Sequence, residues 1–160
     1  MLLTILSALY KETDRERVID CLLTLQQCFS SDYDPIIKAF NDFKGVHILE
    51  QVIVPFTEDI PVVEQILQTM LLVVSKTQFI PQLDQNNIIG ICVQVLIRCS
   101  DEKKVVKLSL KIIRALCLYR KLQNPYSSLF FPYIYVLLSI ITMIYTIHFI
   151  YYAITLSSYG

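Results

Sequence analysis

The chain has 160 residues, with 14 basic and 14 acidic side chains, three glycines and a mean hydropathy of +0.53. This length is typical of one domain, and the scarcity of glycine favours helices over a β-rich fold. Five cysteines without closely spaced pairs argue against a disulfide-stabilised framework. The charges are unevenly distributed, because residues 1–100 carry 7 basic and 12 acidic side chains, residues 101–123 carry 7 and 2, and residues 124–160 carry none. We therefore expect a boundary near residue 124.

The N-terminal part of the chain predicts helix from its start. Residues 1–17 lack the basic start and the cleavage site of a signal peptide and indicate the last turns of a helix. In residues 15–30, apolar side chains recur at helical spacing on one face: Val18, Cys21, Leu22, Leu25, Cys28 and Phe29. Asp14 directly precedes this segment and is expected to cap it.

The same pattern returns twice along the chain. Residues 59–75 and 101–118 each begin with an acidic residue and continue with apolar side chains at helical spacing. Asp14, Asp59 and Asp101 are separated by 45 and 42 residues, and at these offsets most apolar positions of the three segments coincide. Ser109 is the exception, because the other two segments have leucine there. Ser100 or Asp101 lies ahead of the third helix, as Asp59 lies ahead of the second.

A second, shorter helix also repeats, at residues 46–54 and again 42 residues later. Its apolar positions match in pairs: Val46 with Ile88, Leu49 with Ile91, and Ile53 with Val95. At this offset Gly45 falls on Asn87, and both residue types tolerate the left-handed turn between two helices. A period near 42 residues with two or three helices per unit is typical of an α-solenoid.

The stretch DYDPIIKAFNDFKGVHILEQVIVPFTEDIPVVEQILQTMLLVVS resembles an armadillo repeat, a close relative of the HEAT repeat. Its three helices would cover residues 35–41, 46–54 and 59–75. The next copy departs from the family pattern, because PQLDQNN is short and polar and predicts only a turn. The resemblance implies an all-α, armadillo-like α-solenoid of about two and a half repeats in residues 1–123.

The resemblance further implies a non-enzymatic protein-interaction scaffold, because the third helices of armadillo proteins line a groove that holds an extended peptide or a helix. The helix pattern places three sets of side chains on the outer faces of these helices. The sets are Arg17, Asp20, Thr24 and Gln27; Val62, Gln65, Thr69 and Leu72; and Lys104, Lys107, Lys111 and Arg114. The last set forms a basic ridge, which would attract an acidic peptide or an anionic lipid surface. Nucleic acid is disfavoured, since the chain is neutral and no recognition motif accompanies the ridge.

The sequence provides no basis for catalysis or for a cofactor. His47 and His148 are the two histidines, and neither lies in a cluster of ligands that could hold zinc. No glycine-rich phosphate-binding loop occurs. We expect the cysteines to pack as small apolar residues in a reducing, cytoplasmic environment.

The last part of the chain predicts a membrane segment. After a linker at 124–128, residues 129–156 are uncharged, and a helix of this length would span a bilayer. Basic residues on its N-terminal side place the solenoid in the cytoplasm. Two interpretations stay open: a tail-anchored membrane adaptor, or a fragment of a longer repeat protein whose hydrophobic tail is incidental.

Overall fold

The computed structural model describes residues 2–30 and 34–123, and within them it contains helices and no strand. The helices are α1 (Leu2–Lys11), α2 (Arg15–Ser30), α3 (Asp34–Asp42), α4 (Gly45–Ile53), α5 (Ile60–Val74), the 3₁₀ helix η1 (Thr77–Phe79), α6 (Ile80–Gln85), α7 (Ile88–Arg98) and α8 (Lys103–Gln123). The all-α class predicted from the sequence is therefore confirmed. The chain divides into two compact units, Met1–Tyr119 and Arg120–Gly160. The first unit holds α1 to α7 and most of α8.

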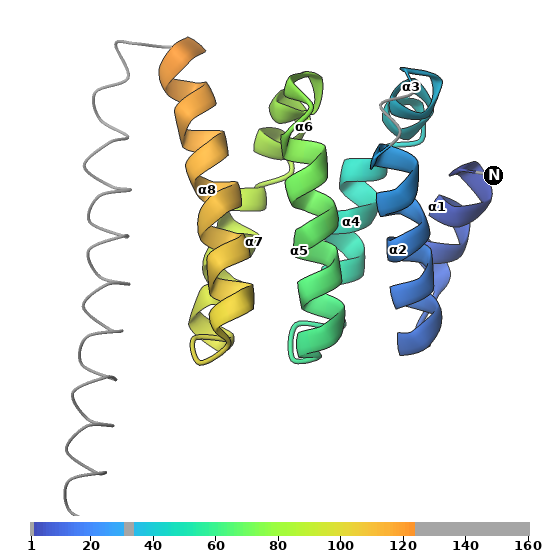
Figure 1. Ribbon diagram of the computed structural model, residues 1–160, viewed down its shortest axis with the longest axis horizontal. Helices are drawn as coiled ribbons and strands as arrows, with labels where there is room; N and C mark the ends of the chain where they lie inside the picture. The colour runs from blue at the N-terminus through green and yellow to red at the C-terminus, as the bar shows by residue number, and fades with distance from the viewer. Residues whose placement is uncertain (1, 31–33, 124–160) are drawn as a thin grey trace, which may run out of the picture. The chain divides into compact units, whose positions relative to one another are not determined.

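Within the first unit the helices lie in two rows. Figure 1 shows α2, α5 and α8 side by side in one row, with α1, α4 and α7 behind them in a second row. The short helices α3 and α6 lie near one end of the long helices, at the top of Figure 1, and the α4–α5 and α7–α8 turns lie near the other end. This arrangement leaves one side of the α2–α5–α8 row facing solvent.

Aspartates cap two helices of the α2–α5–α8 row. The Asp14 carboxylate accepts a hydrogen bond from the backbone N–H of Arg17 at 3.0 Å, and the Asp59 carboxylate accepts one from Val62 at 3.2 Å. Both satisfy a donor in the first turn that has no partner inside the helix, so the predicted cap of Asp14 is confirmed, and Asp59 caps α5 in the same way. α8 begins at Lys103, so Glu102 directly precedes it, and Ser100 and Asp101 lie further from its start.

The buried positions of successive helices recur at a fixed offset. The five buried residues of α2 lie 45 residues before five buried residues of α5, as predicted. From α4 and α5 to α7 and α8, however, the offset is 43 rather than the predicted 42. The matched buried pairs are Leu49 and Cys92, Val52 and Val95, Val62 and Val105, Ile66 and Ser109, and Met70 and Ile113. Ser109 is thus a buried position of α8 that matches Ile66 of α5, whereas the sequence pattern matched it to Leu67.

The same offset corrects the prediction for the turns before α4 and α7. The residues with left-handed backbone are Lys44, at φ 53°, and Asn87, at φ 51°, and they are 43 residues apart. Gly45 is therefore not the turn residue. It is the buried first residue of α4, and a Cβ atom there would overlap the ring of Phe40. The glycine is needed for close packing and not for its backbone freedom.

The segment PQLDQNN forms part of a helix, so the prediction of a turn is wrong. α6 covers Ile80–Gln85, with Pro81 in its first turn, and η1 precedes it. Two apolar residues of α6, Ile80 and Leu83, are buried in the core. They match the buried Ile37 and Phe40 of α3 at the offset of 43 residues. A short helix can be stabilised by such tertiary packing even where its own propensity is low.

Three phenylalanines fill the core where the two rows meet the short helices. Phe29 of α2, Phe40 of α3 and Phe79 of η1 are buried and pack edge to face. Their ring centroids are 4.8 Å apart for Phe29 and Phe40, 5.3 Å for Phe40 and Phe79, and 6.3 Å for Phe29 and Phe79. This geometry is the one that aromatic quadrupoles favour, so the cluster fixes α3 and η1 against α2.

None of the helices in residues 2–30 and 34–123 has the length and hydrophobicity needed to span a bilayer. The predicted linker at 124–128 and the predicted membrane segment at 129–156 lie outside the described residues.

Candidate functional site

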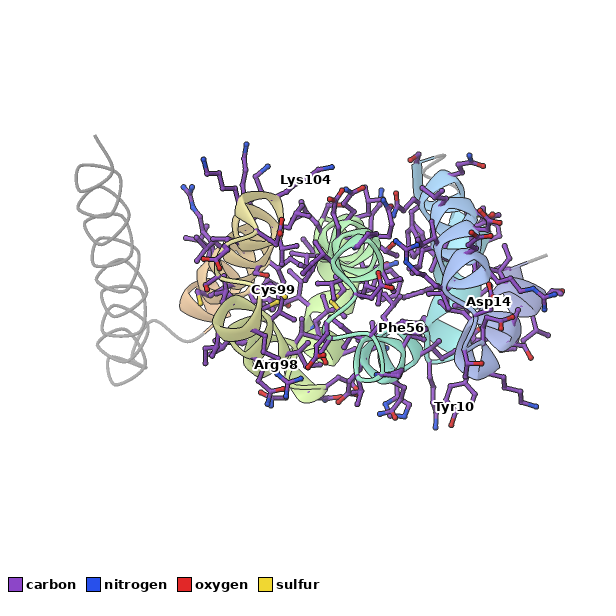
Figure 2. All side chains as sticks on the ribbon, turned by 90° about the horizontal axis from the view of Figure 1, so that it is seen from below. Tyr10, Asp14, Phe56, Arg98, Cys99 and Lys104 are labelled. Atoms are coloured by element: carbon purple, nitrogen blue, oxygen red, sulfur yellow. The ribbon has the colours of Figure 1, made fainter. Side chains whose placement is uncertain are left out.

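The solvent-facing side of the α2–α5–α8 row, which we call the row face, holds the basic ridge predicted from the sequence. Lys104, Lys107, Lys111 and Arg114 are all exposed on α8. Their spacing of 3, 4 and 3 residues places them along one side of the helix. Figure 2 shows Lys104 on the opposite side of the first unit from Tyr10 and Arg98, which come from the other row. The structure therefore brings the four predicted residues together on one exposed surface.

One cation of the ridge is held by the neighbouring helix. Lys104 Nζ forms an ion pair with Glu64 Oε1 of α5, and the amide of Gln68 donates a hydrogen bond to the same oxygen at 2.8 Å. Lys107, Lys111 and Arg114 form no ion pair with any residue that the structure describes. α8 carries no acidic side chain along its length. The ridge is thus a row of cations with one internal counter-ion at its N-terminal end.

The row face of α5 differs from the prediction in two positions. Val62 and Thr69 were expected on the outer face, but both are buried. Thr69 lies against α2, where the amide of Gln26 donates to Thr69 Oγ1 at 3.0 Å and to Gln65 Oε1 at 3.1 Å. The error follows from the offset of 42, which placed Thr69 opposite Lys111.

With the offset of 43, the residue of α5 that matches Lys111 is Gln68, and the residue of α2 that matches both is Leu23. The row face is therefore defined by three residues of each helix at matching positions, together with Arg114. These residues are Glu16, Ile19 and Leu23 of α2, Pro61, Glu64 and Gln68 of α5, and Lys104, Lys107 and Lys111 of α8. None of them is buried. The row-face residues of α2 and α5 were not predicted from the sequence, because the offset of 42 matched other residues to the ridge.

The character of the row face changes from one helix to the next. α8 contributes cations, and α5 contributes one carboxylate and one amide beside a proline. α2 contributes the carboxylate of Glu16 and, beyond it, apolar surface, since Leu23 is 41% exposed and Ile19 is partly exposed. The face thus offers charge at one edge and apolar contact at the other.

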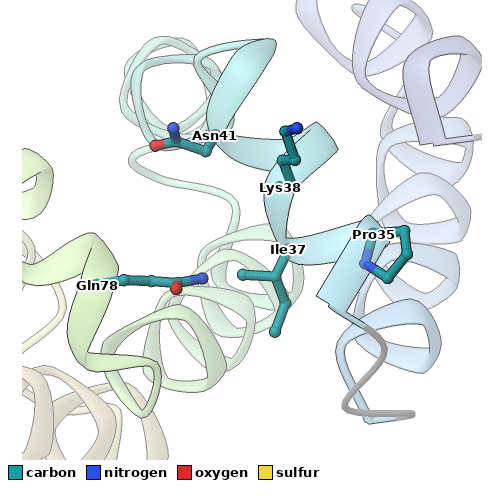
Figure 3. Close-up of a pocket in the computed structure, with 5 residues that line it drawn as sticks. All are labelled: Pro35, Ile37, Lys38, Asn41 and Gln78. Atoms are coloured by element: carbon teal, nitrogen blue, oxygen red, sulfur yellow. The ribbon is translucent and has the colours of Figure 1, made fainter.

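A depression of about 790 Å³ lies between α3 and η1. Figure 3 shows its lining, with Pro35, Ile37, Lys38 and Asn41 on one side and Gln78 on the other. Among the lining residues that the structure describes, Lys38 is the one charged group, and no pair of them is arranged as nucleophile and base. The row face is therefore the stronger candidate for a functional surface.

Other reactive side chains stay dispersed. The five cysteines form no disulfide, and burial raises the pKa of the Cys92 thiol to about 12. Burial also raises the pKa of Cys99 and Cys117. His47 pairs with Glu50 at 3.0 Å on the exposed side of α4. In the part of the chain that the structure describes, no three His, Cys, Asp or Glu side chains gather closely enough to hold a metal ion.

Comparison with known proteins found no matching family model, no matching curated protein and no matching solved structure.

Proposed function

We propose that this protein is a non-enzymatic interaction scaffold, an armadillo-like α-solenoid that binds a protein segment on its row face. The recurrence of buried positions at offsets of 45 and 43 residues supports the solenoid assignment, because stacked repeats bury the same positions in each copy. By this assignment α1 and α2 are the last two helices of one repeat. α3 to α5 form the second repeat, and η1 with α6 to α8 forms the third.

One observation supports the binding role above all others, namely the basic ridge on α8. Four exposed cations at helical spacing repel one another, and like charges three or four residues apart destabilise an isolated helix. An acidic partner would relieve this repulsion, and the field of the ridge would speed its association. Lys104, Lys107, Lys111 and Arg114 are the proposed partner-binding residues.

The test is capture of partners by the full chain in cells, with two matched variants. Lys107→Glu with Lys111→Glu reverses two charges of the ridge. Lys11→Glu with Lys38→Glu makes the same change of charge on α1 and α3, away from the row face. We expect specific partners, identified by chemical cross-links to α8, to be lost with the first pair and retained with the second. Equal recovery with all three proteins would refute the proposal, provided that circular dichroism shows equal helix content.

A second candidate is a membrane-tethered adaptor, and the sequence alone favours it. Seven basic residues in α8 are followed by 37 residues without a charged side chain, residues 124–160. A basic segment beside an uncharged one is the pattern of a membrane anchor with its cytoplasmic flank. Sodium carbonate extraction of the full chain and of a variant lacking residues 129–156 tests this candidate. Membrane retention of the full chain alone would support tethering, and extraction of both would refute it.

A further inference from the structure

The row face is asymmetric, and this asymmetry restricts the chemistry of its partner. At matching positions along the face the side chains are Leu23 on α2, Gln68 on α5 and Lys111 on α8, and one turn earlier they are Ile19, Glu64 and Lys107. A ligand that crosses the three helices therefore meets apolar surface first, then an amide and a carboxylate, and finally cations. A uniformly acidic ligand would gain little from α2.

We propose that the partner is a short protein segment with acidic residues at one end and apolar residues at the other. It crosses the row so that its acidic end lies on the ridge of α8 and its apolar end lies on Leu23 and Ile19. This inference rests on the proposed function, since it takes the row face as the binding surface. It adds the order of side chains that the partner must carry.

The dimensions of the row are suited to such a segment. Packed helices lie about 8–10 Å apart, so the distance from α2 to α8 is about 16–20 Å. An extended chain rises about 3.3 Å per residue, so about six residues cross the row. This is long enough to separate two or three carboxylates from two apolar side chains and short enough for a linear motif.

The charges of the row face favour a protein segment over a membrane surface. An anionic bilayer would approach all three helices together, and it would meet Glu16 on α2 and Glu64 on α5 as well as the ridge. The carboxylate of Glu16 repels anionic headgroups, and that of Glu64 neutralises Lys104 of the ridge. Side chains within a Debye length of about 8 Å contribute to the same field. A segment can place its own acidic residues on α8 alone and avoid both.

The affinity of the full chain for three labelled probes, measured by fluorescence anisotropy, tests the inference. The first probe is a peptide with consecutive glutamates at one end and leucine and phenylalanine at the other, and the second contains only glutamates. The third consists of vesicles of phosphatidylserine and phosphatidylcholine. We expect the first probe to bind about tenfold or more tightly than the second, because burial of the apolar end adds to the ionic contacts.

Two pairs of variants separate the two ends of the site. Lys107→Glu with Lys111→Glu should weaken both peptides about tenfold or more, whereas Lys11→Glu with Lys38→Glu should weaken neither. Leu23→Gln should weaken only the peptide with the apolar end, and Leu3→Gln, which changes an exposed leucine of α1, should weaken neither peptide. Raising the salt concentration should weaken the part of the affinity that comes from the charges of the ridge. It should leave the effect of Leu23→Gln on the affinity unchanged.

Three outcomes would overturn the inference. Equal affinity for both peptides, with no effect of Leu23→Gln, would mean that the ridge binds acidic chains without reading an apolar end, and the proposed function would still stand. Binding of the vesicles alone, lost on changing Lys107 and Lys111, would assign the ridge to anionic lipid instead. Binding of no probe would exclude this class of partner, and the cellular capture experiment would then decide the proposed function by itself.

Discussion

Replacing Gly45 by alanine should destabilise the protein, although alanine is the better helix former. Gly45 begins α4, is buried and has ordinary helical backbone, so its conformation does not exclude alanine. The obstacle is the ring of Phe40, which a Cβ atom would overlap. That ring cannot move away freely, because Phe29 and Phe79 hold it edge to face on two other sides.

The expected magnitude follows from two opposing terms. Adding a methyl group to a well-packed core costs about 1–3 kcal/mol. Replacing glycine by alanine within a helix gains about 0.5–1 kcal/mol. The difference predicts that Gly45→Ala lowers the free energy of unfolding by about 1 kcal/mol, and by at most about 2.5 kcal/mol. Urea unfolding followed by circular dichroism at the helical band will measure this loss.

Gly90→Ala is the matched control, because it changes the same residue type in α7. There the atoms nearest to a Cβ atom belong to the side-chain amide of Asn87, which can rotate away. We expect Gly90→Ala to be neutral or slightly stabilising. Equal stability of the two alanine variants would refute the argument from Phe40.

A compensating change tests the same contact from the other side. In the next set of helices Leu83 and Ile88 occupy the positions of Phe40 and Gly45, so a smaller side chain in the short helix accompanies a larger one at the start of the following helix. Phe40→Leu should therefore reduce the cost of Gly45→Ala, with a coupling energy of about 1 kcal/mol in a double-mutant cycle. Additive effects would show that Phe40 does not create the requirement for glycine.

Three further predictions concern a cap, a buried hydroxyl and a buried thiol. Asp59→Ala should cost about 1–2 kcal/mol, because it removes both the cap on Val62 and the 2.8 Å ion pair with Arg15, whereas Asp59→Asn should keep most of the cap. Ser109→Ala should stabilise the protein by about 1 kcal/mol, because the buried Oγ of Ser109 has no hydrogen-bond partner among the described residues. The pKa of Cys92 is raised from 9.0 to about 12 in the folded chain, so the unfolded chain loses this proton first as the pH rises. Between pH 8 and pH 10 the thiol should therefore cost about 1.4 kcal/mol of stability, a loss that Cys92→Ala should not show.

Each of these predictions has a clear contrary result, measured by the same urea unfolding. Equal stability of Asp59→Ala and the unchanged protein would mean that α5 begins without its cap. A loss of stability in Ser109→Ala would mean that the hydroxyl is satisfied. An equal fall in stability above pH 8 with and without Cys92 would assign the pH dependence to other groups.

Sequence reasoning predicted the helices that carry strong local signals. The amphipathic stripe and the cap residue at each N-terminus were sufficient for α2 and α5, because both signals lie within a few residues of the feature they determine. α6 was missed because its stability comes from Ile80 and Leu83 packing against distant parts of the chain. A six-residue polar segment is too short for a periodic pattern from which this packing could be predicted.

The offset between repeats was wrong by one residue, and the reason is local. Asp101 and Glu102 are both acidic, and the first was taken as the start of the third long helix, whereas Glu102 directly precedes α8. Loop length leaves no periodic signal, so one ambiguous position shifted every match that depended on it. Exposure of the ridge was still predicted correctly, because it depends on the period of α8 alone. The ion pair between Lys104 and Glu64 needed the correct offset and could not be found without it.

The polar contact among Gln26, Gln65 and Thr69 has a mechanical consequence for the stack. Hydrogen bonds inside a partly buried interface resist sliding, because a shifted register leaves their donors and acceptors unmatched. At the next joint the matching positions are apolar, namely Leu71 of α5 and Leu108 and Ile112 of α8. Apolar surfaces tolerate small shifts at low cost, since their attraction is not directional. If the stack is bent or stretched, the contact between α2 and α5 should therefore resist movement. The contact between α5 and α8 should shift first.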